Sequence, residues 1–303
     1  SQVKALTTDQ LVALSTDQAA KLTTAMVSSL TSDQVSALET SDLAKFDTAN
    51  IQALTTASLA ALTTNQINKL TTDQINALTS NQVKALTTDQ LVALSTEQAS
   101  KLTTSVMATL TTDQVAALET VDLAALSTSV ISNLTTAQVK ALTTDQIIAL
   151  STDQAAKLTT VQVKSLTTDQ VAAIETADLA KLSTSHIQAL NASVTALTVA
   201  QFKSMSSDQV NALTSTQVRA LTTDQVVALT TDQAAKLSTD MVKALTTDQV
   251  KALEVDDLAK FSTDAISKMS TEQLHVLTAE QVAALTAQQR AAMSTAQINA
   301  LPT

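Results

Sequence analysis

The sequence contains no glycine, cysteine, tryptophan or tyrosine, and its 303 residues include one proline and three phenylalanines. The absence of cysteine excludes disulfides and thiolate zinc sites. The absence of glycine excludes glycine-rich phosphate loops and removes the usual residue for the tight corners of a β-solenoid. Because aromatic side chains are so few, we expect a thin aliphatic core, which suits a narrow coil better than a globule.

Basic residues are also scarce, since 18 Lys and Arg face 28 Asp and Glu, for a net charge of −10. Nucleic acids and anionic membrane surfaces are bound by basic patches, so the charge argues against both partners. No apolar run approaches the ~20 residues of a transmembrane helix, and no basic and hydrophobic leader opens the sequence. We therefore expect a soluble chain without membrane insertion.

What the chain does have is a period of eight residues. Leu6, Leu14, Leu22 and Leu30 begin a ladder that continues, with rare Ile, Met or Phe, to Leu301. With 45% hydrophobic and 15% charged residues, the chain is too apolar to be disordered. The period predicts one repeat array over residues 1–303 rather than two or three globular domains.

One unit, LTTDQINAL starting at Leu70, has the pattern of a helix start. With Thr71 at the N-cap, Gln74 falls at N3, and the two can form a capping box. Leu70 at N′ can then pack on Ile75 at N4, while Asp73 at N2 meets the positive end of the helix dipole. Each octad is therefore expected to be a short helix whose last Leu is the N′ residue of the next.

Two other folds could have an eight-residue period, one continuous helix and a β-solenoid. In one continuous helix, eight residues at ~100° each would shift successive Leu by about 80°, leaving no continuous apolar face. A β-solenoid suits Thr and Val but lacks glycine for its corners. An isolated two-turn helix is unstable in water and must stack on neighbours. We predict an all-α solenoid of very short, about two-turn helices restarted every eight residues.

Longer repeats overlie the octad. The segment STDQAAKL at 15–22 returns in close variants at 95–102, 151–158 and 230–237, giving spacings of 80, 56 and 79 residues. A second marker, ET or EV followed closely by DLA, has the same spacings, at Glu39, Glu119, Glu175 and Glu254. These markers predict four super-repeats, at approximately 7–86, 87–142, 143–221 and 222–301.

The spacings themselves carry two further hypotheses. The difference between 80 and 56 is three octads, so three octads are a candidate for one turn of the coil. The difference between 80 and 79 is one residue, lost from the seven-residue unit at 191–197, which predicts a local kink. The unit that directly follows it has Val at N1, Val199.

The sequence offers no candidate catalytic or cofactor-binding residue. His186 and His275 are the only histidines, and they occupy different positions within their units. Each is interpreted as a solvent-facing variant of its octad position. No cysteine or glycine-rich turn supplies a nucleophile, an oxyanion hole or a phosphate loop. We therefore predict a protein that is not an enzyme and holds no cofactor.

Asp recurs at N2 in many units, so stacked units could align carboxylates in a row that binds calcium, and Asp256 with Asp257 forms the densest acidic spot. The helix dipole already explains N2 Asp, and the spacing matches no EF-hand loop, so no metal site is predicted. Regularly spaced Thr hydroxyls could order water or ice. Helix capping explains these Thr more simply.

Two resemblances are relevant. LTTDQVVAL at 221–229 resembles the first helix of transcription-activator-like effector repeats, which commonly have LTP followed by QVVAI. That family has ~34-residue repeats, a glycine-containing base-reading loop and basic surroundings, so DNA binding is rejected. The whole chain resembles long Thr- and Ala-rich repetitive proteins of proteobacteria with LTTDQ or LTTAQ octads, which are often secreted or displayed. That resemblance implies a structural or adhesive role outside the cell or at its surface.

These observations predict a non-enzymatic structural protein that self-associates as an extracellular or cell-surface fibre, head to tail or laterally. The alternative is a binding module, either an adhesin stalk or a repeat scaffold for a protein or glycan partner. A binder needs exposed positions that differ between super-repeats, whereas a fibre subunit needs lateral faces that repeat.

Overall fold

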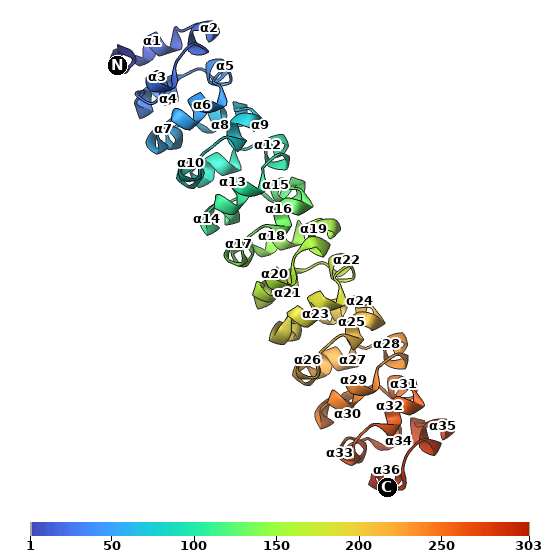
Figure 1. The fold of residues 1–303 in the computed structure, drawn as a ribbon. Helices are drawn as coiled ribbons and strands as arrows, with labels where there is room; N and C mark the ends of the chain where they lie inside the picture. The colour runs from blue at the N-terminus through green and yellow to red at the C-terminus, as the bar shows by residue number, and fades with distance from the viewer. Residues whose placement is uncertain (1, 303) are drawn as a thin grey trace. The chain divides into compact units, whose positions relative to one another are not determined.

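The computed structural model describes residues 2–302, and in that range every regular element is a short helix and none is a strand. The chain divides into two compact units, unit 1 at residues 1–157 and unit 2 at residues 158–303 (Figure 1). The all-α solenoid of very short helices predicted from the sequence is confirmed within each unit.

Unit 1 contains one 3-10 helix and nineteen α-helices. The first ten elements are η1 Gln2–Ala5, α1 Thr8–Val12, α2 Thr16–Ala19, α3 Thr24–Val27, α4 Ser32–Ala37, α5 Thr40–Leu43, α6 Thr48–Ala53, α7 Thr56–Ala60, α8 Thr64–Lys69 and α9 Thr72–Asn76. The others are α10 Ser80–Ala85, α11 Thr88–Val92, α12 Thr96–Ser100, α13 Thr104–Thr109, α14 Thr112–Ala116, α15 Thr120–Ala125, α16 Thr128–Ser132, α17 Thr136–Ala141, α18 Thr144–Ile148 and α19 Thr152–Lys157.

Unit 2 has the same construction and one further 3-10 helix, η2. Its first nine elements are α20 Thr160–Ser165, α21 Thr168–Ala173, α22 Thr176–Leu179, α23 Thr184–Ala189, η2 Asn191–Ala196, α24 Val199–Ser204, α25 Ser207–Asn211, α26 Ser215–Ala220 and α27 Thr223–Val227. The others are α28 Thr231–Ala235, α29 Thr239–Ala244, α30 Thr247–Ala252, α31 Val255–Leu258, α32 Thr263–Ser267, α33 Thr271–His275, α34 Ala279–Ala284, α35 Ala287–Ala291 and α36 Thr295–Ala300.

The helix start at α9 has the predicted phase. Thr71 is the N-cap with extended backbone, and its hydroxyl accepts from the Gln74 N–H at 3.2 Å while Gln74 Oε1 accepts from the Thr71 N–H at 2.8 Å. Leu70 at N′ and Ile75 at N4 are both buried. Local interactions inside one octad therefore fix where each helix begins and which side chains form the aliphatic core.

Successive turns are built by helices three octads apart. In unit 1, α4 packs on α1, α7 on α4 and α10 on α7, and in unit 2 α29 packs on α26. Hydrogen bonds between turns join residues that are 25 to 31 apart, as from Asn68 Nδ2 to the Ala93 carbonyl, 25 residues away, and from Gln66 Nε2 to the Leu38 carbonyl, 28 residues away. The hypothesis of three octads for each turn is therefore close, and one turn takes slightly more than three.

The seven-residue unit at 191–197 is absorbed locally. It forms η2 instead of an α-helix, and Asn191 has a left-handed backbone with φ 48°. Gln201 reaches a carbonyl 27 residues back, whereas Gln225, beyond η2, again reaches one 28 residues back. The backbone thus departs from the α-helical octad at this unit, while a kink of the coil stays a prediction, and the stacking of turns continues on both sides of it within unit 2.

Replacing three adjacent N-cap threonines, Thr71, Thr79 and Thr87, with alanine tests the contribution of the caps. Each hydroxyl accepts from the N3 backbone N–H of its helix, so we expect a loss of about 1 kcal/mol at each site. Circular dichroism and thermal melting measure the loss. The matched control replaces the N1 residues Thr72, Ser80 and Thr88 with alanine. If the two triple variants melted alike, the assigned helix phase would be incorrect.

Candidate functional site at the N3 position

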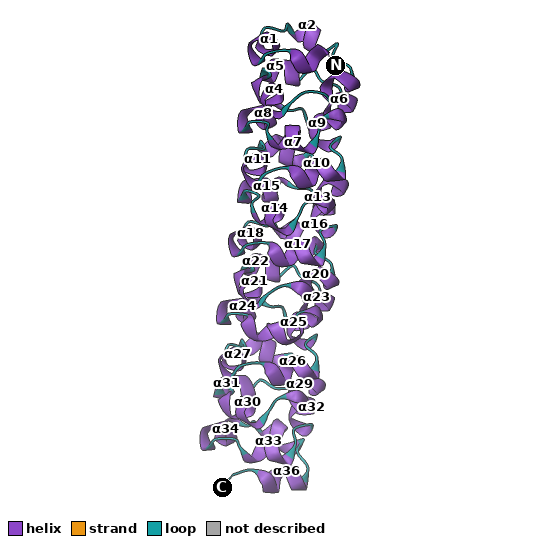
Figure 2. Cartoon of the chain, turned by 90° about the vertical axis from the view of Figure 1, so that its left-hand side faces the viewer, coloured by secondary structure: helices purple, strands orange, loops and turns teal. Residues whose placement is uncertain are grey.

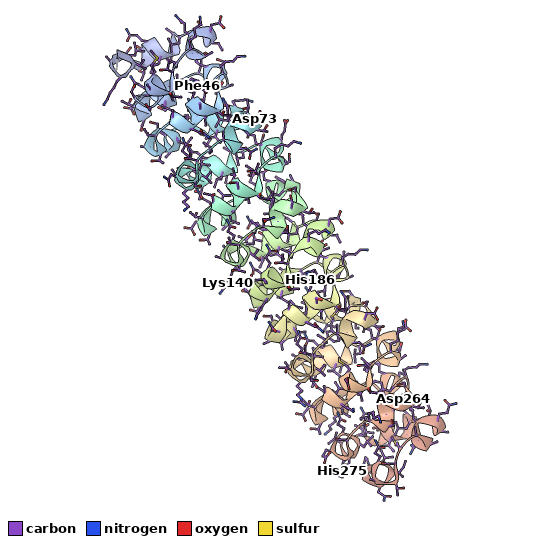
Figure 3. The ribbon with its side chains drawn as sticks, viewed as in Figure 1. Phe46, Asp73, Lys140, His186, Asp264 and His275 are labelled. Carbon is purple, nitrogen blue, oxygen red and sulfur yellow. The ribbon has the colours of Figure 1, made fainter. Side chains whose placement is uncertain are left out.

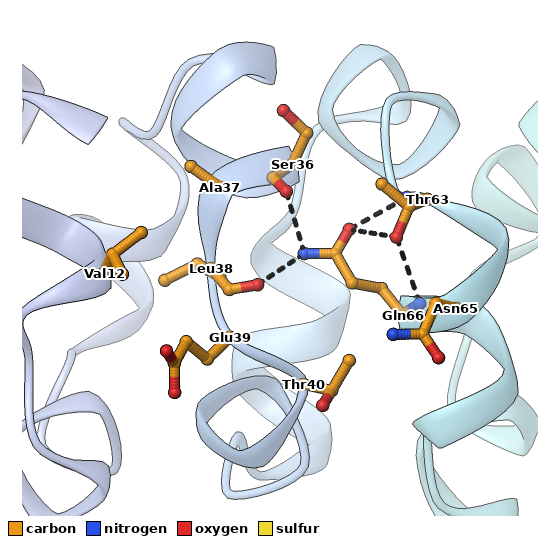
Figure 4. A pocket seen from close by; sticks show the side chains of 9 residues that line it. All are labelled: Val12, Ser36, Ala37, Leu38, Glu39, Thr40, Thr63, Asn65 and Gln66. Atoms are coloured by element: carbon orange, nitrogen blue, oxygen red, sulfur yellow. Dashed lines mark hydrogen bonds between the residues drawn. The ribbon is translucent and has the colours of Figure 1, made fainter. Parts of the chain in front are cut away.

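The N3 glutamine is the polar side chain around which each turn is organised. Gln66 is buried, and its Oε1 accepts from the Thr63 N–H at 2.8 Å. Its Nε2 donates to the carbonyls of Val35 at 3.0 Å and Leu38 at 2.7 Å, in the preceding turn (Figure 4). One amide therefore closes the start of its own helix and ties that helix to the turn before it. Sequence reasoning found only the capping function.

The same bond recurs through both units, with Nε2 to carbonyl distances of 2.6–2.8 Å. The glutamines that donate to a carbonyl 27 or 28 residues earlier are Gln34, Gln66, Gln74, Gln82, Gln90, Gln98, Gln114, Gln138, Gln146 and Gln154 in unit 1. In unit 2 they are Gln201, Gln209, Gln225, Gln233, Gln249, Gln273, Gln281, Gln289 and Gln297.

Shorter donors at N3 reach the same carbonyl. Asn50 Nδ2 donates to the Leu22 carbonyl at 2.9 Å, and Ser58 Oγ donates to the Leu30 carbonyl at 3.3 Å. Both acceptors lie 28 residues earlier, as for glutamine. Donors of different length therefore reach this carbonyl. Other helices have an apolar residue at N3, namely Met26, Val106, Val130, Met241 and Ala265.

His186 also occupies N3, where its Nδ1 accepts from the Ser183 N–H at 3.2 Å. Partial burial lowers the pKa of the imidazole, and a hydrogen bond to the Leu158 backbone acts in the opposite direction. His275 is exposed on the last residue of α33 (Figure 3). The prediction of a solvent-facing ring is confirmed for His275 and needs correction for His186, whose ring is partly buried.

Four octads carry aspartate at N3, and they are the octads of the second super-repeat marker. The side chains of Asp42, Asp122, Asp178 and Asp257 are only 1–2% exposed. Their helices have a glutamate at the N-cap, with no side-chain capping hydrogen bond. Asp42 Oδ2, both carboxylate oxygens of Asp122, and Asp257 Oδ2 are buried without a hydrogen-bond partner. A buried acceptor thus replaces the usual donor.

Burial changes the acidity of these carboxyls. It raises the pKa of Asp257 to about 6, with further upward contributions from the charges of Glu254 and Asp256. It also raises the pKa of Asp122, an effect that the Thr96 side chain opposes and the charge of Glu119 reinforces. In both cases removal from water is the largest cause, because burial disfavours the charged form of a carboxyl.

Asp256 and Asp257, the densest acidic spot in the sequence, differ in their exposure to solvent. Asp256 is exposed at N2, while Asp257 at N3 is buried. Adjacent helix positions point about 100° apart, which places the two carboxylates in different surroundings. Over residues 2–302, no three or more His, Cys, Asp or Glu side chains gather in a group that could hold a metal ion.

A family model described as the ALTTAQ repeat matches residues 35–72, 43–80, 59–88, 70–104, 115–152, 192–223, 212–239 and 250–287. Together the matched segments cover well over half of the chain. The chain belongs to the ALTTAQ repeat family. The letters of the repeat correspond to the helix start, with Leu at N′, Thr at the N-cap and N1, and Gln at N3, as in Leu134 to Gln138. No curated protein matches the sequence.

Helices that occupy equivalent positions in successive super-repeats lie on the same side of unit 1. A spacing of 80 residues corresponds to three turns of about 27 residues, and 56 to two turns of about 28, both within the span of the inter-turn hydrogen bonds. Accordingly, α1, α11 and α18 lie along the same side in Figure 2. Each presents an exposed aliphatic residue at N5, namely Val12, Val92 and Ile148.

Charged residues accompany these aliphatic side chains at constant offsets. An exposed lysine precedes each by eight residues, and an exposed aspartate precedes each by three. The lysines are Lys4, Lys84 and Lys140, and the aspartates are Asp9, Asp89 and Asp145. Lys140 is at the edge of the ribbon in Figure 3. This set, which we call the register side, repeats one basic, one acidic and one apolar group in each super-repeat. The aspartates and aliphatic residues lie on α1, α11 and α18, and the lysines lie one octad earlier, on η1, α10 and α17.

An open hollow adjoins the register side where α1, α4, α5 and α8 meet. It is about 430 Å³ in volume and is lined by Val12, residues 36–40, Thr63, Asn65 and Gln66 (Figure 4). Its lining offers hydroxyls, amides and the single carboxylate of Glu39.

None of the helices between residues 2 and 302 has the length and apolar character required to cross a membrane.

Proposed function

We propose that this ALTTAQ repeat protein is a non-enzymatic structural element that self-associates laterally through the register side. The observation that carries the proposal is the return of α1, α11 and α18 to one side of unit 1, since a fibre subunit needs lateral faces that repeat. These helices carry the exposed Val12, Val92 and Ile148. Val227 occupies the corresponding position of the fourth super-repeat in unit 2 and is also exposed.

The chemistry of the register side is self-complementary. Lysine and aspartate at fixed offsets allow two copies to pair opposite charges, and the exposed aliphatic side chain adds apolar contact at each repeat. Each contact is weak, because exposed ion pairs contribute at most about 1 kcal/mol. Repetition along one side makes later contacts intramolecular once the first has formed, so avidity grows with the number of super-repeats.

The setting of this role follows from composition and resemblance. We place the protein outside the cell or on its surface because it resembles secreted and displayed repetitive proteins with LTTDQ octads. Its principal partner is a second copy of itself, and the net charge of −10 argues against nucleic acid. The competing role is an adhesin stalk or scaffold that binds a protein or glycan.

The test compares the wild-type chain with a variant in which Val12, Val92, Ile148 and Val227 become glutamine, a residue already present at N5 in Gln52. Light scattering and electron microscopy across concentration should show wild-type assemblies and at least a tenfold shift in the concentration that the variant needs. The control replaces Val161 and Val199 with glutamine. Both are exposed valines, and valine does not occur at the equivalent positions of the other super-repeats. Wild-type monomers at every concentration would overturn the proposal and favour the adhesin or scaffold role.

A further inference from the structure

The N3 position faces a backbone carbonyl 28 residues earlier, and its usual occupants donate a hydrogen to that carbonyl. The side chain of Asn50 has the same length as aspartate and makes this bond to Leu22 at 2.9 Å. By the same register, the carbonyls opposite Asp42, Asp122 and Asp257 belong to Leu14, Leu94 and Leu229. A carboxylate at N3 therefore presents an acceptor to an acceptor.

Protonation changes what the aspartate can do. A neutral carboxyl has one O–H donor, whereas a carboxylate has only acceptors. Two buried acceptors that face each other leave both without a partner, which is costly in a low-dielectric interior. Both carboxyl oxygens of Asp122 and Oδ2 of Asp257 are buried without a hydrogen-bond partner.

We propose that the buried N3 aspartates Asp122 and Asp257 are proton-operated joints, at which a protonated carboxyl donates to the carbonyl of the preceding turn and an ionised carboxylate releases that contact. Binding of a proton closes the joint, and loss of the proton lets the turn open locally. Acid therefore tightens the coil at these two helices, and neutral pH loosens it there. This inference concerns the stability of the coil and does not depend on self-association.

The surroundings contain no buried cation that would hold these carboxylates ionised. For Asp122, the charged residues on its own helix start and on the helices packed against it, α12 and α18, are Glu119, Glu97, Lys101 at the end of α12, and Asp145. For Asp257, with α28 and α34, they are Glu254, Asp256, Asp232, Lys236 and Glu280. The lysines in both sets are exposed, and the remaining charges are acidic.

The sign of the pH dependence follows. Because burial raises the pKa of Asp257 to about 6, its contribution to stability is complete below its ordinary value near 3.8 and is lost as pH rises through 6. Asp122, whose pKa is also raised, acts in the same direction.

The experiment measures urea denaturation midpoints of the full chain between pH 4.5 and 8. The wild-type midpoint should fall as pH rises through 6. The variant Asp122→Asn and Asp257→Asn supplies a permanent donor at both joints, so its midpoint should stay high and lose most of the pH dependence. A control with the exposed N2 residues Asp113 and Asp248 changed to Asn removes the same charge and should retain the wild-type slope.

Equal slopes in the wild type and the N3 variant would overturn the proposal. Amide hydrogen exchange on the wild-type chain provides an independent test if the N3 variant does not fold. After correction for intrinsic rates, amides of α15 and α31 should exchange at least tenfold faster at pH 7.5 than at pH 5, relative to helices with N3 glutamine. A uniform change across all helices would also overturn it.

Discussion

Replacing Gln82 with glutamate is expected to lower the free energy of unfolding by about 3 to 5 kcal/mol at pH 7, the range for an uncompensated buried charge. Gln82 is 2% exposed and donates to the carbonyls of Ile51 and Leu54, each at 2.8 Å. Glutamate would retain the length of the side chain but replace the donor with a charged acceptor. Urea denaturation of the full chain measures the loss.

Gln82→Ala is the matched comparison. It removes the donor without adding charge, so the expected loss is about 1 to 3 kcal/mol, the cost of unsatisfied buried carbonyls. Acidification should restore part of the stability of the glutamate variant, because its protonated form can donate, and should give no such recovery with alanine. If glutamate cost no more than alanine at pH 7, the contact between the N3 side chain and the carbonyls would not have the assigned energetic role.

Truncation of the core at Leu59 should have a comparable effect. Leu59 is the N4 residue of α7, is 0% exposed, and lies in a helix that packs between α4 and α10. Leu59→Ala removes buried methyl groups from a thin core, and we expect a loss of about 2 to 5 kcal/mol. The loss is measured by denaturation, with hydrogen exchange to locate it.

Val92→Ala serves as the control because Val92 is 41% exposed, and we expect it to change stability by less than about 0.5 kcal/mol. In a stacked array each turn contacts only its neighbours, so the increase in exchange for Leu59→Ala should be largest in α4, α7 and α10. Equal losses in the two variants would contradict the assignment of N4 to the core.

The helix starts could be predicted from the sequence because their determinants lie within one octad. Thr71, Gln74, Leu70 and Ile75 interact over at most five residues, so the capping pattern alone specifies the phase. The number of octads in a turn could also be estimated, because the spacings of 80 and 56 residues between super-repeats differ by three whole octads. A difference of whole octads leaves the position of every helix cap unchanged. The solenoid and its aliphatic core followed from these two levels.

The inter-turn role of N3 could not be predicted from the capping pattern, because it joins residues 28 apart and depends on the length of a turn. For the same reason, the burial of the N3 aspartates could not be predicted from the sequence. In sequence Asp256 and Asp257 are equivalent acids, and only their places on the helix separate an exposed side chain from a buried one. A signal was present, since Asp at N3 occurs with Glu at the N-cap in all four super-repeat markers.

The glutamine bond has a fixed direction along the chain. The donor always comes later in the sequence than the carbonyls that receive it, as Gln66 does relative to Leu38. During synthesis the N-terminal part of a chain emerges first, so each glutamine appears when its acceptors are already available. The coil is therefore expected to grow by addition of one octad at a time onto a finished template, without waiting for distant segments.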